Sequence, residues 1–184
     1  MKETPEYRAI AAFYGDRVAQ RSQVRLMQHI DDGLNILTAI QGSDKAKRAF
    51  CLHPLFQADA DLVTVGLDFM KWGRSPDAWV MMLVMEYRNR ANDWLAKKVN
   101  FVRYNYDHEP VLEYTGLPTP GPLAEVRDML VADKVQNYTD FLDHHDGKHE
   151  KSRELNAYFQ QWLDILKIDD AEFNELRNLI KRSR

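Results

Sequence analysis

The chain has 184 residues, a formal net charge of −3 and a single cysteine, Cys51. This length suits one domain with its own core, and the weak net charge gives no general reason to bind nucleic acid. A lone cysteine excludes an intrachain disulfide and suits a reducing compartment. The longest apolar run falls far short of the roughly 20 residues that a membrane helix needs. We therefore expect a single cytoplasmic domain over residues 1–184, with no membrane partner.

Helix signals dominate the N-terminal part. Thr4 followed by Pro5 is typical of a helix start, and the spacing of apolar residues predicts a helix up to about Val18. A second helix is predicted over residues 26–40 and ends at residues 41–42, Gln-Gly.

A proline interrupts the third predicted helix, which Ser43 caps. Pro54 disfavours the α conformation for His53, the residue before it. We expect this helix to end or kink near His53. Pro54 could equally be the first residue of a fourth helix that runs to about Phe69.

Helices also dominate the second half. Ser75 and Pro76 open a long predicted helix that runs to Leu95. Residues 99–122 alternate weakly and then collect prolines and glycines, which predicts a loop or a short hairpin insertion. Further helices follow, the last of them opened by a capping box of Asp169 and Glu172. The sequence predicts an all-α bundle of about seven or eight helices with one long irregular loop.

Three segments carry candidate site residues. The first leads from Arg21 into a helix with His29, the second is His53-Pro54-Leu55-Phe56-Gln57-Ala58-Asp59, and the third is Leu130-Val131-Ala132-Asp133-Lys134-Val135-Gln136-Asn137. Their order and spacing resemble the three metal-site motifs of HD-domain hydrolases of the RelA/SpoT type, the small alarmone hydrolases. The resemblance covers roughly residues 7–60 and 123–167.

The resemblance implies an HD-domain-like fold with a divalent cation, typically Mn²⁺, held by His29, His53 and Asp133. Imidazole and carboxylate ligands suit such a cation, which activates water for attack on phosphorus. The implied partner is a small-molecule nucleotide, either a guanosine tetraphosphate-type alarmone or another purine nucleotide. The residues implied to hold it are Arg21, Gln57, Lys134 and Asn137.

The chain departs from the family pattern around the second motif. Pro54 stands where the family has the Asp of its His-Asp pair, and Gln57 and Ala58 replace a Glu-Asp pair that assists the attacking water. Gln57 cannot act as a general base, because an amide does not ionise in the useful range. The candidates to supply the missing carboxylate are Asp59, Asp61 and Glu86.

Two other interpretations stay open. The chain could be a binding module on the same fold that holds a nucleotide or a protein partner without hydrolysis, which would suit a phage or mobile-element protein that sequesters a host signal. It could also be an all-helical interaction protein with structural histidines, because a lone His on an amphipathic helix is more often a packed residue than a ligand. A homo-oligomer is compatible with each. His144, His145 and His149 fit no standard zinc spacing, and we expect them at an exposed helix end.

Overall fold

The protein is all-α. The computed structural model describes residues 1–20, 22–66, 68–69, 77–104, 124–148 and 150–184, and of residues 93–104 it describes the backbone. Within these ranges there are eight α-helices, one π-helical segment and no β-strand, so the predicted fold class is confirmed. The elements are α1 (Pro5–Tyr14), α2 (Leu26–Ala39), α3 (Asp44–Gln57), α4 (Asp59–Asp61), η1 (Leu62–Gly66), α6 (Ala78–Tyr104), α8 (Ala124–His144), α9 (Ser152–Leu166) and α10 (Asp170–Ser183). None of the helices in the described ranges has both the length and the apolarity needed to cross a bilayer.

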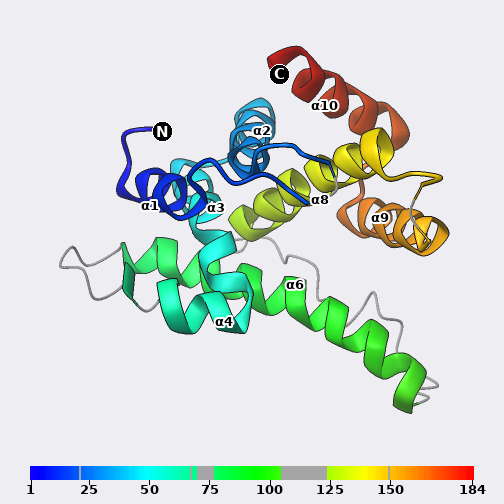
Figure 1. Ribbon diagram of the computed structural model, residues 1–184, viewed down its shortest axis with the longest axis horizontal. Coiled ribbons are helices and arrows are strands. Elements are labelled where there is room, and N and C mark those ends of the chain that lie inside the picture. The colour runs from blue at the N-terminus through cyan, green and yellow to red at the C-terminus, as the bar shows by residue number, and fades with distance from the viewer. Residues whose placement is uncertain (21, 67, 70–76, 105–123, 149) are drawn as a thin grey trace.

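Helix α8 forms the centre of the bundle. It packs against α2, α3, α6, α9 and α10, and Figure 1 shows it running through the middle of the molecule from α3 towards α9 and α10. Its buried residues include four polar ones, Asp133, Lys134, Gln136 and Thr139. A helix covered on most sides therefore carries charged groups into the interior, where they must be paired.

Helix α1 begins where the sequence predicts but ends earlier. The Thr4 side chain accepts a hydrogen bond from the Tyr7 amide, and Pro5 is the first helical residue. The helix stops at Tyr14 because Gly15 adopts a φ of +53°, which a glycine tolerates and a continuing helix does not. The predicted extension to Val18 is therefore wrong, and Val18 instead pairs with Arg25 in an isolated antiparallel bridge.

Helix α3 does not end at His53. Ser43 caps it as expected, but it continues through Pro54 to Gln57, and Ala58 then adopts an extended conformation. The predicted end near His53 and the predicted new helix from Pro54 are both wrong. Packing explains the difference, because Leu52 precedes the proline and Leu55 and Phe56 follow it, and all three are completely buried. Helices in proteins owe most of their stability to such packing.

Helix α6 is longer than predicted. It reaches Tyr104, so residues 99–104 are helical rather than part of a loop or hairpin. Valine and aromatic residues lower helix propensity only slightly, and neither glycine nor proline stands between Leu95 and Tyr104 to end the helix. The rest of the expected loop lies outside the described residues. At the other end of the chain, the predicted capping box is confirmed, since Asp169 accepts a hydrogen bond from the Glu172 amide.

Candidate metal centre

Two histidines and an aspartate from three helices meet in the interior. His29 Nε2 on α2 lies 3.2 Å from His53 Nε2 on α3, and these nitrogens lie 3.6 and 3.8 Å respectively from Asp133 Oδ1 on α8. For a triangle with these three sides, the point equidistant from the three atoms lies about 2.1 Å from each of them. A cation at that point would be at a normal metal–ligand distance from all three. The sequence expectation that these residues lie together is confirmed.

The protonation of the His53 ring follows from its other nitrogen. His53 is almost fully buried, and its Nδ1 lies 2.6 Å from the carbonyl oxygen of Phe50. A carbonyl can only accept, so Nδ1 carries the proton and donates. Burial, with a further contribution from His29, lowers the pKa of His53 to about 3. The ring is therefore neutral at physiological pH, and its Nε2 presents a lone pair to the centre.

The His29 ring is oriented by a side chain of α8. Its Nδ1 lies 2.6 Å from Gln136 Oε1, while Gln136 Nε2 donates to Asp140 Oδ2 at 2.8 Å. The Asp140 carboxylate sets which way the Gln136 amide points, because a carboxylate can only accept hydrogen bonds and must therefore face the NH₂ group of Gln136. The amide oxygen therefore faces His29 and accepts from Nδ1–H, so Nε2 is the His29 nitrogen that is directed at the centre.

Two imidazole nitrogens and a carboxylate oxygen thus face one another. A divalent cation placed among them could accept an electron pair from each. Histidines that ligate metals generally donate their other N–H to a carbonyl or carboxylate group, as both do here through Phe50 and Gln136. The donor set therefore fits a divalent cation.

Asp133 is held in the charged form needed for a ligand. Burial alone would raise its pKa, but the Lys134 ammonium holds the pKa of Asp133 well below its usual range. Lys134 Nζ lies 2.7 Å from Oδ2, and Asn137 Nδ2 donates to Oδ1 at 2.8 Å. Since Lys134 occupies the other oxygen, Oδ1 is the atom directed at the histidines.

A buried tyrosine hydroxyl beside the centre supports this assignment. The centroids of the Tyr87 and His53 rings lie 5.0 Å apart, and Tyr87 is completely buried. Burial, the nearby Asp133 charge and the approach of the hydroxyl to the Asp133 carboxylate raise the pKa of Tyr87. The hydroxyl reaches no partner at normal hydrogen-bond geometry within the described part of the chain. A buried polar atom without a partner calls for an explanation, and water bound to an ion at the centre would supply one.

The centre lies at the wall of a pocket of about 310 Å³, within the range of small-molecule sites. Two of the expected nucleotide-binding residues, Gln57 and Asn137, line it. Lys134 does not, since its ammonium lies against the Trp162 ring at 4.9 Å, and Arg21 lies outside the described residues. The lining residues are Tyr14, Ala19, Ser22, Val24, Arg25, Leu26, His29, His53, Pro54, Gln57, Asp133, Gln136, Asn137 and Asp140.

The expected catalytic carboxylates are not among the residues that line this pocket. Asp59 has an exposed side chain and pairs with Arg88, and Glu86 pairs with Arg90 one turn along α6. Asp61 on α4 is likewise absent from the lining. Their catalytic role stays a prediction. At the histidine tract the predicted helix end is confirmed, because α8 ends at His144, but His144 and His145 are half-buried rather than exposed. His149 lies outside the described residues.

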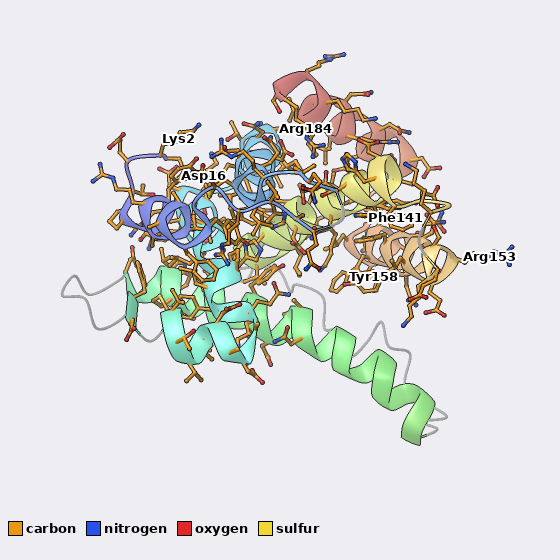
Figure 2. The ribbon with its side chains drawn as sticks, viewed as in Figure 1. Lys2, Asp16, Phe141, Arg153, Tyr158 and Arg184 are labelled. Atoms are coloured by element: carbon orange, nitrogen blue, oxygen red, sulfur yellow. The ribbon has the colours of Figure 1, made fainter. Side chains whose placement is uncertain are left out.

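Sequence reasoning missed the polar groups behind His29. Gln136 and Asp140 lie three and seven residues after Asp133, on the same face of α8. That spacing is a signal that could have identified them. Asp140 in turn accepts from Arg184, the last residue of the chain, which Figure 2 labels. Arg184 Nε and Nη2 also donate to Oδ2 of the fully buried Asp32, at 3.0 and 2.8 Å respectively. No local pattern points to Arg184.

Known proteins add no identification, because no family model, no curated protein and no solved structure matches this chain.

Proposed function

We propose that the chain is a metal-dependent nucleotide phosphohydrolase or pyrophosphohydrolase of the HD-domain type. Its expected substrate is a guanosine tetraphosphate-type alarmone or a related purine nucleotide in the cytoplasm. The proposal rests on one observation, the convergence of two imidazole nitrogens and a carboxylate oxygen at a pocket wall. A divalent cation, expected to be Mn²⁺, would polarise a phosphoryl oxygen there and lower the pKa of a water molecule.

The pocket-facing residues have the chemistry to hold a nucleotide. The Gln57 and Asn137 amides can hydrogen-bond to ribose hydroxyls and phosphate oxygens. Arg25 lines the same pocket, and its guanidinium pairs with a fully exposed Asp16 side chain. Such an exposed ion pair contributes little stability. Arg25 can therefore exchange Asp16 for a phosphate, which a guanidinium binds in bidentate fashion.

A second function, nucleotide binding without hydrolysis, is favoured by the state of the carboxylates. Two carboxylates line the described pocket, Asp133 and Asp140. Asp133 belongs to the metal cluster, and Asp140 accepts from both Gln136 and Arg184. Neither is free to take a proton from water as a general base. Hydrolysis would then rely on the cation alone, and slow or absent turnover would leave a binding protein.

Two measurements test the proposal. Elemental analysis of the purified protein, followed by titration of metal-free protein with Mn²⁺, should give one bound cation that His29→Ala and Asp133→Asn remove. Incubation with guanosine tetraphosphate and Mn²⁺, followed by anion-exchange chromatography, should release pyrophosphate.

Asp143→Asn is the matched control, because Asp143 is also an α8 aspartate paired with cations, Arg177 and Lys181. It should leave metal content unchanged. Metal binding without pyrophosphate release would select the binding function. A wild-type protein that takes up no Mn²⁺ would contradict the phosphohydrolase, and binding of guanosine tetraphosphate by such a protein would leave the binding function.

A further inference from the structure

Pro54 occupies an unusual position, inside α3 and directly after the metal-centre residue His53. A proline inside a helix is strongly disfavoured, because its ring has no N–H to donate to the carbonyl four residues earlier. The packing of α3 tolerates this loss but does not explain why a proline stands here.

The carbonyl that loses its helical donor is the one that orients His53. In a regular helix the amide of residue 54 would donate to the carbonyl of residue 50. Pro54 has no such hydrogen, and the Phe50 carbonyl instead accepts from His53 Nδ1 at 2.6 Å. The missing backbone hydrogen bond and the imidazole hydrogen bond thus concern the same oxygen atom.

The neighbouring ring holds this arrangement in place. The centroid of the Phe50 ring lies 4.6 Å from that of the His53 ring and 5.7 Å from that of the His29 ring. The residue that supplies the carbonyl therefore also packs on both imidazoles. An imidazole three residues after a carbonyl reaches it from the same helix face. The sequence Phe-Cys-Leu-His-Pro over residues 50–54 therefore contains the acceptor, the imidazole and the proline that leaves the acceptor free.

We propose that Pro54 is a positioning residue of the metal centre: by withholding a helical N–H, it reserves the Phe50 carbonyl for His53 Nδ1–H and so directs the Nε2 lone pair at the cation. This inference rests on the proposed cation binding. Pro54 stands where the HD-domain pattern has the Asp of its His-Asp pair. The proposed role explains how a proline at that position can benefit the metal centre.

The variant Pro54→Ala separates this role from a purely structural one. Alanine restores the N–H, which then competes with the imidazole for the Phe50 carbonyl. The melting temperature of the metal-free protein should rise, because alanine is a far better helix residue than proline. Affinity for Co²⁺, used as a spectroscopic probe and followed by titration, should fall by roughly 10-fold, the lower end for loss of an outer hydrogen bond to a metal-ligating His. The visible bands of bound Co²⁺ should also shift.

A second readout does not depend on metal. Long-range ¹H–¹⁵N spectra of the metal-free protein report which His53 nitrogen carries the proton. Wild type should have it on Nδ1, and Pro54→Ala should have a mixture of the two tautomers.

Pro5→Ala is the matched control. Pro5 is the first residue of α1, where an amide has no helical acceptor, so this substitution should leave the Co²⁺ affinity and bands unchanged. Equal Co²⁺ affinity, equal bands and an unchanged His53 tautomer in Pro54→Ala would overturn the role of Pro54 alone. A wild-type protein that binds no Co²⁺ would overturn this inference together with the proposed function. If Pro54→Ala does not fold, the same two readouts on Pro54→Ser decide the question.

Discussion

The two imidazoles of the metal centre face each other but are held in different ways. His53 is almost fully buried, and its partner is a carbonyl three residues earlier in its own helix. The His29 side chain is 18% exposed, and its partner Gln136 lies 107 residues away. From Gln136 the hydrogen bonds continue through Asp140 to Arg184. One half of the centre therefore depends on local helix geometry, and the other on the packing of α2, α8 and α10.

The largest loss of stability and of cation binding is expected at Asp133, where the two halves of the centre meet. Asp133→Asn removes the charge that both imidazoles face and leaves Lys134 buried without its anion. Breaking a buried ion pair costs about 3–5 kcal/mol, so the free energy of unfolding in urea should fall by that amount, and Co²⁺ binding should be lost. The control Asp143→Asn removes a more exposed pairing and should cost much less. Equal losses in the two variants would show that Asp133 has no special role.

A smaller loss is expected at Gly33, which should disturb both halves together. A Cβ atom built at Gly33 would lie 2.2 Å from Cε1 and Cζ of Phe50, the ring that packs on both imidazoles. Gly33→Ala should therefore destabilise the protein by about 1–3 kcal/mol, as overpacking does, and weaken Co²⁺ binding. Thermal unfolding and titration measure the two effects. Asn35→Ala, at an exposed position of the same helix, should change neither; a tolerated Gly33→Ala would mean that Phe50 can move without cost to the centre.

The pH dependence of stability should report His53. Burial lowers the pKa of His53 to about 3, below the value of about 6.5 for an exposed histidine. Between these values the unfolded chain binds a proton that the folded protein excludes, so stability is full above about pH 6.5 and is lost as pH falls towards 3. The expected slope is at most about 1.4 kcal/mol per pH unit. Urea unfolding of metal-free protein at several pH values measures it, and His53→Asn should reduce the slope. An unchanged slope in that variant would assign the dependence to other groups.

The smallest effect on Co²⁺ affinity is expected furthest from the centre, at the end of the His29 chain. Arg184→Gln should weaken Co²⁺ binding by about 10-fold, as loss of an outer hydrogen-bond partner does. Arg177→Gln is the matched control, because Arg177 also joins α10 to an α8 aspartate, Asp143, which does not line the pocket. It should leave the affinity unchanged. Equal affinities in the two variants would mean that Gln136 holds His29 without help from α10.

Local signals explain which parts of the fold could be predicted. Thr4, Ser43 and Asp169 each cap a helix through a side-chain hydrogen bond to an amide three residues later. Such bonds form within one turn, so the sequence specifies them directly. The prediction failed at Pro54, because the propensity of a single residue was outweighed by the buried apolar residues of α3 on both sides.

The sequence by itself determined the all-α class, most helix starts and, through order and spacing, the grouping of His29, His53 and Asp133. The tertiary structure decided which atoms of those residues face one another, because tautomers depend on acceptors such as Gln136 that only packing brings near. It also decided that Asp59 and Glu86 pair with arginines instead of lining the pocket. Helix periodicity determines how a side chain points relative to the axis of its own helix. A site shared by several helices also requires the tertiary packing that places those helices against one another.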